Sequence, residues 1–140
     1  MTAQLLTPEG MFQPVPYHHV AVGAGTRHVH IAGQIARDEA GNPVATGDLA
    51  GQIRQALRNT ARGLGGAGAS FTDVVRLRFF VTGWSAANRD AIMTAFLAGI
   101  DSVTDELGIP RPLPPLSVIG VDYLFEPDVL VEIEAYAILA

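Results

Sequence analysis

The sequence predicts an α+β domain in which two helices lie on one face of a single mixed sheet of about five to six strands. Several stretches alternate between apolar and polar side chains, as strands do, and two longer stretches repeat apolar residues every three or four positions, as helices do. These stretches follow one another in the order β-β-α-β-α-β-β. Both helical stretches are long enough to connect strands by right-handed crossovers.

The first part of the chain is predicted to contribute two strands. Residues 1–16 contain proline and glycine without a periodic pattern, which is typical of a loop or arm. Residues 17–23 are predicted as a short strand, and residues 27–35 as a longer one that alternates. One face of the longer strand carries Val29, Ile31 and Gly33, and the other carries His28, His30, Ala32 and Gln34.

A first helix is expected to begin near Asp48, because the side chain of Thr46 or Asp48 can accept from free N–H groups in the first turn. Its apolar stripe consists of Leu49, Ile53, Ala56, Leu57, Thr60 and Leu64. Gly65, Gly66 and Gly68 are expected to end the helix.

A strand, a helix and a further strand follow. Residues 73–82 are predicted as a strand with Val75, Leu77, Phe79 and Val81 on its apolar face and Arg76, Arg78 and Phe80 on the other. Ser85 is predicted to cap a second helix over about residues 86–107, which Gly108 and Pro110 end. Three prolines then lead into a strand over residues 116–123.

The last strand, residues 129–139, has the most regular pattern in the chain. Its odd-numbered residues are all apolar, so we expect this strand to be central in its sheet. Its even-numbered face carries two carboxylates, Glu132 and Glu134. Either this face is solvated or it lines a cleft, and the question of function depends on which.

The face of the sheet that the helices leave uncovered is predicted to be chemically mixed. The charged content of the chain is 16%, below the roughly 25% of an average soluble domain. A symmetric oligomer that buries this face would explain both observations. Its expected members are His28, His30, Ala32, Gln34, Arg76, Arg78, Leu116, Val118, Gly120, Glu132, Glu134 and Tyr136.

Composition excludes several classes of protein. A net charge of −5 over 140 residues gives no electrostatic basis for binding nucleic acid. The chain has no cysteine, which excludes disulfides, thiol catalysis and zinc–thiolate sites. The N-terminal sequence lacks the pattern of a signal peptide, and no apolar stretch is long enough to span a membrane. We therefore expect a single domain over residues 1–140, located in the cytoplasm.

Short motifs along the chain carry a resemblance. They are Pro16-Tyr17, Ile31-Ala32-Gly33-Gln34, Gly47-Asp48, Gln52, Asn59, Gly68, Asp73-Val74-Val75, Asn88, Pro115, Ser117-Val118-Ile119-Gly120-Val121 and Val131-Glu132-Ile133-Glu134-Ala135. In this order, and with few gaps from about residue 17 to residue 137, they resemble the Rid/YjgF proteins, also called the enamine/imine deaminase or reactive-intermediate deaminase family.

The resemblance implies a chorismate-mutase-like α+β fold and a homotrimer whose three sheets form a central barrel, with clefts for a small-molecule ligand between subunits. It also implies hydrolysis of a 2-imino or enamine acid to the 2-keto acid and ammonia, with no cofactor and no metal. In that reaction Glu132 lies near the attacking water, and the backbone amide of Gly33 contacts the substrate. Tyr17 and Asn88 would help to shape the cleft.

Two residues depart from the family pattern. Leu116 takes the place of the arginine that clamps the substrate carboxylate, and leucine has no hydrogen-bond donor. Ala32 takes the place of the serine in the family's Ser-Gly-Gln motif. Arg111, in the loop before the prolines, is either a stand-in for the missing arginine or a surface charge.

Other candidate residues keep two interpretations each. Glu132 either orients a water molecule or is a barrel-lining carboxylate paired with Arg76 or Arg78. Tyr17 either stacks on a substrate or lies in a subunit interface. Asn88 either lines the cleft or is a polar group in the first turn of the second helix.

The four histidines are not explained by the resemblance. His18 and His19 are adjacent on a predicted strand, so at most one of them enters a cleft. His28 and His30 share a face, where they either bind a metal or an anion around a threefold axis or are buried in an interface.

Two functions of different classes follow. The first is a cofactor-free hydrolase of an enamine or imine, acting on a non-standard substrate that is larger or aromatic, because Leu116 makes the cleft more apolar. The second is a non-enzymatic small-molecule-binding or chaperone-like trimer that has lost this activity. Nuclease activity, sometimes attributed to the family, is disfavoured by the acidic net charge.

Overall fold

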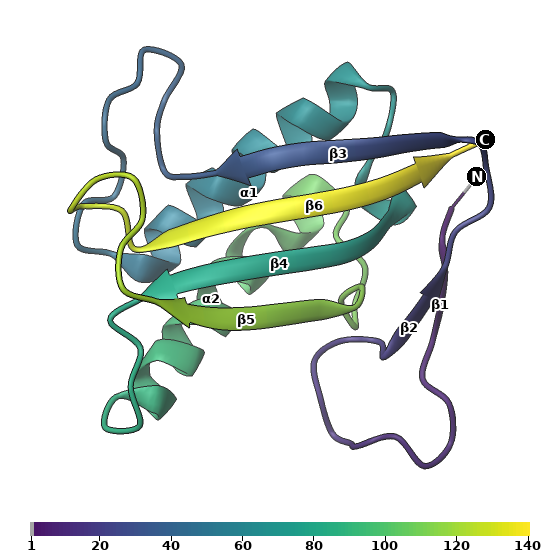
Figure 1. The fold of residues 1–140 in the computed structure, drawn as a ribbon, viewed down its shortest axis with the longest axis horizontal. Helices are drawn as coiled ribbons and strands as arrows, with labels where there is room; N and C mark the ends of the chain where they lie inside the picture. The colour runs from purple at the N-terminus through teal and green to yellow at the C-terminus, as the bar shows by residue number, and fades with distance from the viewer. Residues whose placement is uncertain (1) are drawn as a thin grey trace.

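A computed structural model describes residues 2–140, which form six strands, two α-helices and one short 3₁₀ helix (Figure 1). The predicted α+β class, with two helices against one face of a sheet, is confirmed. In chain order the elements are β1 (Gln4–Leu6), β2 (Val20–Val22), β3 (Arg27–Gln34), α1 (Leu49–Gly66), the 3₁₀ helix (Phe71–Asp73), β4 (Val74–Thr82), α2 (Arg89–Leu107), β5 (Leu116–Val121) and β6 (Val131–Leu139).

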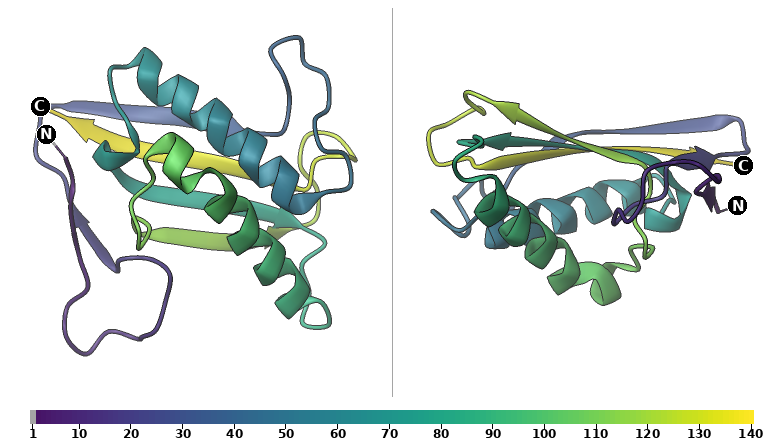
Figure 2. Two further views of the ribbon diagram at one scale, coloured as in Figure 1. Left: turned by 180° about the vertical axis from the view of Figure 1, so that it is seen from behind. Right: turned by 90° about the horizontal axis from the view of Figure 1, so that it is seen from below.

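Four of the strands form the main sheet, in the order β3-β6-β4-β5. β5 is parallel to β4, and the other pairs are antiparallel. Both helices lie on the same side of this sheet, and the other side is uncovered (Figure 2). β6 lies between β3 and β4, as its apolar pattern predicted.

The sequence predicted one sheet, but β1 and β2 form a separate antiparallel ribbon beside the main sheet (Figure 1). The chain turns sharply between β2 and β3 at Gly25, which has a φ of +150°. A Cβ atom there would lie 2.0 Å from the carbonyl oxygen of Leu139, so only glycine fits this turn. The short β2 therefore pairs with β1 alone.

The alternation of β6 is confirmed. Its apolar face is buried against the helices, and the members with their exposed fractions are Val131 0%, Ile133 0%, Ala135 4%, Ala137 0% and Leu139 5%. Val129, which the prediction included, precedes the strand and is also buried. β4 departs from the prediction at its start, because a bulge between Val74 and Arg76 shifts the register against β6. Val74 is buried in the core as a result, and Val75 lies on the uncovered face.

β5 presents the opposite face from the one predicted. Leu116 and Val118 pair in parallel with the core residues Leu77 and Phe79, so they point toward the helices and pack against the core. Ser117 lies on the uncovered face, where its hydroxyl accepts a hydrogen bond from Arg76. The alternation of β5 is ambiguous because both of its faces are largely apolar, and only the register against β4 fixes which one is inside.

α1 begins where predicted. Asp48 is the N-cap residue, and its carboxylate accepts from the backbone N–H of Gly51 at 3.1 Å. α2 begins at Arg89, later than the predicted start, and Ser85 does not cap it. Instead the Asn88 side chain accepts from the N–H and hydroxyl of Ser85, which ties this segment into a turn before the helix.

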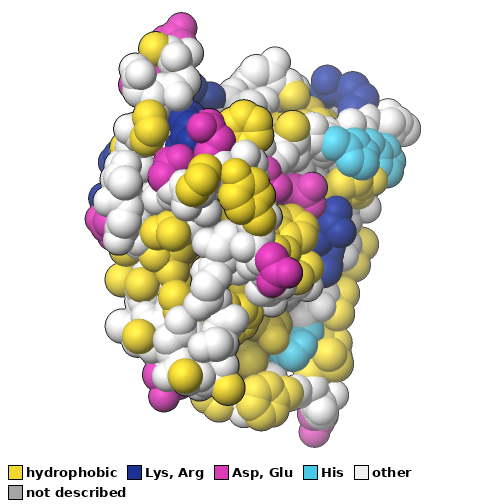
Figure 3. Space-filling view, turned by 60° about the vertical axis from the view of Figure 1, so that its left-hand side comes forward, with side chains coloured by type: hydrophobic (Ala, Val, Ile, Leu, Met, Phe, Trp, Pro, Cys, Tyr) yellow, Lys and Arg dark blue, Asp and Glu magenta, His cyan; other side chains and the backbone are white. Residues whose placement is uncertain are grey.

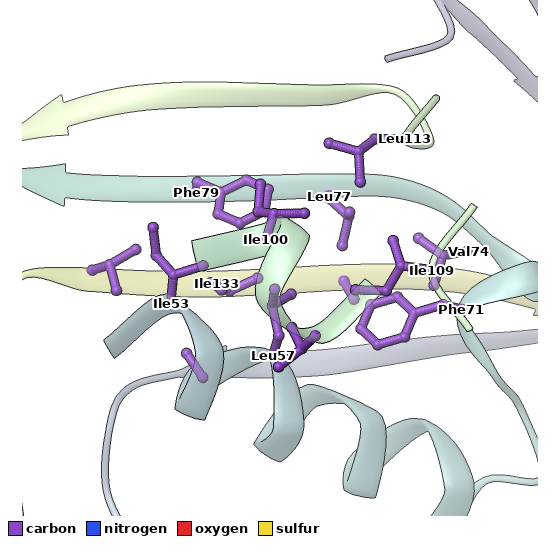
Figure 4. Packing of buried hydrophobic residues seen from close by; sticks show 14 of the residues in the cluster. Ile53, Leu57, Phe71, Val74, Leu77, Phe79, Ile100, Ile109, Leu113 and Ile133 are labelled. Carbon is purple, nitrogen blue, oxygen red and sulfur yellow. The ribbon is translucent and has the colours of Figure 1, made fainter. Parts of the chain in front are cut away.

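The core lies between the sheet and the two helices (Figure 4). Phe79 of β4 and Phe96 of α2 meet at its centre, with ring centroids 4.7 Å apart and ring planes nearly perpendicular. Neither α1 nor α2 combines the length and apolar character that a membrane-spanning helix requires.

Replacing Asp48 by alanine is expected to lower the free energy of unfolding by about 1 kcal/mol, because an N–H group at the start of α1 loses its acceptor. Chemical denaturation measures the change. Asp90→Ala in the first turn of α2 is the control, since that exposed carboxylate is not a cap and pairs only with the adjacent Arg89. Equal changes in the two variants would contradict the capping role.

Candidate active site

The candidate site is built around a bulge in β3. Ile31 pairs with Ala135 and Gln34 pairs with Ile133, so Ala32 and Gly33 together lie opposite the single residue Glu134. The extra residue reverses the alternation that the sequence predicted. Gln34 now points to the helix side, and its side-chain amide donates to the Ala32 carbonyl oxygen at 2.9 Å. Gly33 comes to lie on the uncovered face.

Glu132 and Gly33 are in direct contact on this face. A Cβ atom on Gly33 would lie 2.5 Å from the carboxyl carbon of Glu132 and 2.8 Å from its Oε1. The carboxyl group therefore occupies space that only a glycine leaves free. Two of the predicted site residues thus come together, and the bulge is what brings the glycine to the carboxylate.

The surroundings of Glu132 favour its protonated form. Burial raises the pKa of Glu132, and the negative charge of Glu134 raises it further. Its cross-strand neighbour on β4 is Phe80, which offers no charge. Within residues 2–140, no arginine forms an ion pair with Glu132.

Arg78 forms an ion pair with Glu134 rather than with Glu132. Arg78 pairs with Glu134 in the register of β4 and β6, and its Nη2 lies 3.0 Å from Glu134 Oε1. The approach is poorly directed for a hydrogen bond, so this contact is mainly an ion pair. The interpretation that Glu132 is a carboxylate paired with an arginine therefore does not hold within one protomer.

The other predicted site residues lie elsewhere in the protomer. Tyr17 forms an isolated bridge with Leu113, which precedes β5, and so lies toward the opposite end of the sheet from Glu132. Leu116 pairs with Leu77 on the helix side of the sheet. Among residues 2–140, no strand pairing, hydrogen bond or ion pair joins these residues to Glu132.

Asn88 and Arg111 also lie apart from Glu132. The Asn88 amide donates to the Gly83 carbonyl oxygen at 2.6 Å and stabilises the turn before α2. The Arg111 guanidinium lies 3.2 Å from Asp105, and both side chains are exposed. In a single protomer Arg111 is therefore a surface charge, and a role as a clamp requires it to leave Asp105.

Gln52 and Asn59 have a role that the sequence interpretation missed. Gln52 is buried in α1, where it donates to the carbonyl oxygens of Ala45 and Asp128 and accepts from the N–H of Leu130 at 2.9 Å. Asn59 donates to the carbonyl oxygens of Ile35 and Arg37. The two amides fix the segments that lead into Glu132 and away from Gly33. The available signal in the sequence was the position of Gln52, three residues after Leu49 and four before Ala56 in the apolar stripe of the helix. A polar side chain at such a position is expected to be buried and to need hydrogen-bond partners.

An ion pair joins the same two segments. The Arg37 guanidinium contacts both carboxylate oxygens of Asp128, at 2.8 and 3.0 Å, and Glu126 at 3.2 Å. The hydrogen bonds with Asp128 raise the pKa of Arg37, and in return they lower the pKa of Asp128. Among residues 2–140, no group of three or more histidine or carboxylate side chains is arranged to hold a metal ion.

This arrangement of strands and helices, with a strand glutamate held against a strand glycine, defines a small α+β protein of the chorismate-mutase-like class. The chain belongs to the Rid/YjgF family. Residues 12–139 match the family described as endoribonuclease L-PSP.

Solved structures agree with this assignment. A Rid-family protein of unknown function from Yersinia pestis, YyfB, is 38% identical with a TM-score of 0.81, over 99% of this chain and 100% of that one. The Escherichia coli protein TdcF, solved with bound serine, is 25% identical with a TM-score of 0.61, over 91% of this chain and 97% of that one. The E. coli YjgF gene product, at 23% identity and a TM-score of 0.65 over 97% and 94% of the two chains, shares the fold.

Proposed function

We propose that this protein hydrolyses an enamine or imine intermediate to a carbonyl compound and ammonia without a cofactor. The observation that carries the proposal is the Glu132 carboxyl group, which lies against Gly33 on the uncovered face and has no arginine partner among residues 2–140. A carboxylate free of an ion pair can accept a proton from water. Its raised pKa also makes this carboxylate a stronger base than an ordinary glutamate.

In the proposed reaction Glu132 holds a water molecule and accepts a proton from it as the oxygen bonds to the imine carbon. The carbon–nitrogen double bond becomes a single bond, and the nitrogen takes up the proton that Glu132 has accepted. The resulting carbinolamine then loses ammonia as its hydroxyl proton passes through Glu132 to the nitrogen and the carbonyl group forms, so one water is consumed for each ammonia released. The backbone amide of Gly33 is proposed to hold the substrate beside the carboxylate.

The proposed substrate differs from the usual small 2-imino acid. Leu116 offers no donor for a bidentate carboxylate clamp, so a larger or aromatic substrate fits better. The E. coli relative TdcF binds serine, which supports a small-molecule ligand on this fold.

The proposed assembly is a homotrimer with clefts between subunits. The uncovered sheet face and the loop after β5 expose the apolar side chains Ile119, Tyr123 and Phe125, the last 71% exposed. Tyr17 is distant from Glu132 within one protomer, so it reaches the same cleft only from a neighbouring subunit. Tyr17 and Asn88 are proposed to line this cleft, whereas Leu116 packs against the core on the helix side. Sedimentation equilibrium tests the trimer.

The direct test is ammonia release from imines that an amino-acid oxidase generates in solution. Small aliphatic and bulky aromatic substrates are compared, each with and without the protein. Faster release with aromatic imines than with aliphatic ones supports both the reaction and the substrate class. No acceleration across the panel rejects the hydrolase and leaves a binding or chaperone-like role.

Replacing Gly33 by alanine is expected to reduce the hydrolysis rate by at least tenfold while changing the free energy of unfolding by less than about 1 kcal/mol. The new Cβ meets the end of the flexible Glu132 side chain, which can move away at little cost but then no longer holds the water. Gly65→Ala in α1 is the matched control, because a Cβ there meets no atom within 4 Å. An active Gly33→Ala protein would contradict the proposed site.

The hydrolysis rate is expected to fall as the pH drops, because protonated Glu132 cannot accept a proton from water. Burial and the charge of Glu134 raise the pKa of Glu132, so the loss begins above the usual range for glutamate. Glu134→Gln removes the second cause and is expected to shift this acid limb to lower pH. Profiles of kcat/KM against pH for both proteins measure the shift, and coincident limbs would contradict it.

A further inference from the structure

We propose that Arg37 and Asp128 are positioning residues, whose ion pair holds the Glu132 carboxyl group against Gly33. The two residues act through the backbone, because they belong to the segments that lead away from Gly33 and into Glu132. The inference deepens the proposed hydrolysis and rests on it for the effect on the reaction rate. All of the contacts involved lie within one protomer.

The ion pair lies just beyond the end of the ladder between β3 and β6. These strands are antiparallel, and their last pair in this direction is Gln34 with Ile133. Arg37 lies four residues after Gly33, and Asp128 lies four residues before Glu132. A bond between Arg37 and Asp128 therefore draws together the two chain segments at this end. Figure 3, which turns this end of the molecule forward, shows acidic and basic side chains side by side there.

The contact fixes orientation as well as distance. The two terminal nitrogens of the Arg37 guanidinium donate to the two carboxylate oxygens of Asp128, at 2.8 and 3.0 Å, and Nη2 also donates to Glu126 at 3.2 Å. Parallel charge-assisted hydrogen bonds of this form are stronger and more directional than a single one. The Arg37 side chain is 12% exposed and that of Asp128 25%, so water competes little for the pair.

The ladder alone holds this end of β3 weakly. β3 is an edge strand of the main sheet, and among the strands of residues 2–140 only β6 pairs with it. The bulge at Ala32 and Gly33 interrupts the regular pairing, which leaves Gln34 as the single paired residue beyond it. A strand end with interrupted pairing opens at a low cost in free energy. The ion pair supplies the constraint that the ladder lacks.

The amides of Asn59 and Gln52 do not replace this bond. Asn59 ties the segment after β3 to α1, and Gln52 ties the segment before β6 to the same helix. Each amide thus places one segment on the helix. Among the side-chain hydrogen bonds and ion pairs within residues 2–140, those of Arg37 alone join residues 35–38 directly to residues 126–130.

The consequence for Glu132 is a carboxyl group that is protected from water. It is faced by Phe80 on β4, by Gly33 on β3 and by the charge of Glu134 on its own strand. Burial raises the pKa of Glu132 more than the charge of Glu134 does. Once the ion pair is broken, the strand ends part and water reaches the carboxyl group, so this pKa should fall toward the ordinary value of about 4.3.

The first test measures the pKa of Glu132 by NMR of its isotope-labelled carboxyl carbon during a pH titration, with no substrate present. The variant is Arg37→Met with Asp128→Asn, which removes one charge of each sign and keeps an apolar stem of similar length. The control is Arg58→Met with Glu106→Gln, which breaks a bidentate pair between α1 and α2 whose two bonds are both 2.8 Å long. A pKa below that of the wild type and the control supports the inference, and a pKa equal to or above that of the control overturns it.

The second test measures imine hydrolysis by the same proteins. In the Arg37→Met, Asp128→Asn protein kcat is expected to fall at least about tenfold, with a smaller change in KM, because a misplaced carboxylate slows the chemical step. The acid limb of its kcat/KM profile should move to lower pH together with the pKa of Glu132, a shift that lower stability alone does not produce. A kcat equal to that of the control overturns the positioning role.

Arg37→Lys keeps the inference testable if the double variant does not fold. Lysine keeps the charge but replaces the bidentate contact by a single bond, so both kcat and the pKa of Glu132 are expected to fall below their wild-type values. Wild-type values of both quantities would contradict the inference. If the wild-type protein hydrolyses no imine, the proposed function fails, and the NMR comparison still decides whether the ion pair holds Glu132 in place.

Discussion

Replacing Glu132 by glutamine is expected to lower the rate of imine hydrolysis at least about 100-fold while leaving the fold intact. Glutamine has nearly the same shape, so it still occupies the space above Gly33. Its amide, however, cannot accept a proton from the attacking water. Ammonia release under single-substrate conditions measures the loss, and a variant that keeps more than a tenth of the activity would remove Glu132 from the mechanism.

The same variant is expected to be more stable than the parent protein at neutral pH. Burial raises the pKa of Glu132 in the folded protein, so the folded state disfavours the charged carboxylate more than the unfolded state does. This penalty is fully present above the raised pKa and disappears below the ordinary pKa of glutamate, about 4.3. The melting temperature of Glu132→Gln should therefore exceed that of the parent at pH 7 and match it near pH 3.5. Inactivity together with higher stability separates a lost catalytic group from a damaged fold.

Replacing Gln52 by leucine is expected to lower the free energy of unfolding by about 3 kcal/mol. Leucine fills a similar volume, so the loss is not that of a cavity. Instead the part-buried carbonyl oxygen of Asp128 and the N–H of Leu130 lose their partners, and each unsatisfied group costs about 1–3 kcal/mol. Equilibrium denaturation by urea measures the change.

Thr60→Val is the matched control for Gln52→Leu, because Thr60 is equally buried in the same helix. Its hydroxyl donates only to the Ala56 carbonyl oxygen, which keeps its helical hydrogen bond after the change. We expect a loss of less than about 1 kcal/mol. If Gln52→Leu is no worse than this control, its hydrogen bonds to the loops do not hold the structure together.

The sequence predicted the structure correctly where only one periodic pattern fitted the residues. The odd-numbered residues of β6 are uniformly apolar, and they identify both the strand and its central place. Asp48 is followed at once by the stripe of α1, which marks the start of that helix. In both cases a local pattern and the tertiary packing require the same arrangement.

The faces of Gly33 and Gln34 in β3, of Val75 in β4 and of all of β5 could not be predicted, for two physical reasons. The rest of β4 follows the prediction, since Leu77, Phe79 and Val81 are buried. Each bulge adds one residue to a strand and reverses the alternation after it, yet nothing in the residues around Gly33 or Val75 marks the extra residue. In β5, apolar residues occupy both faces, so only pairing with β4 decides that Leu116 points inward. Serine is a common capping residue, but the hydroxyl of Ser85 donates to the Asn88 side chain and does not cap the helix.

The candidate site was predictable as residues but not as contacts. The family resemblance indicated Glu132 and Gly33, whereas their contact depends on a bulge. The pairing of Arg78 with Glu134 depends on the register between β4 and β6. A shift of that register by two residues would bring Arg78 opposite Glu132 with the same pattern of side chains, and no sequence pattern distinguishes the two.

The place of β6 in the sheet also has a consequence for biosynthesis. β3 and β4 are made long before residues 131–139, and each needs β6 as a neighbour. Until those residues leave the ribosome, β3 has no strand beside it and β4 has only β5. The nascent chain must therefore keep its strand edges exposed through most of translation, and the sheet closes in a late step. A ribosome that stalls before β6 would release a chain without a completed sheet, which chaperones and proteases would have to handle.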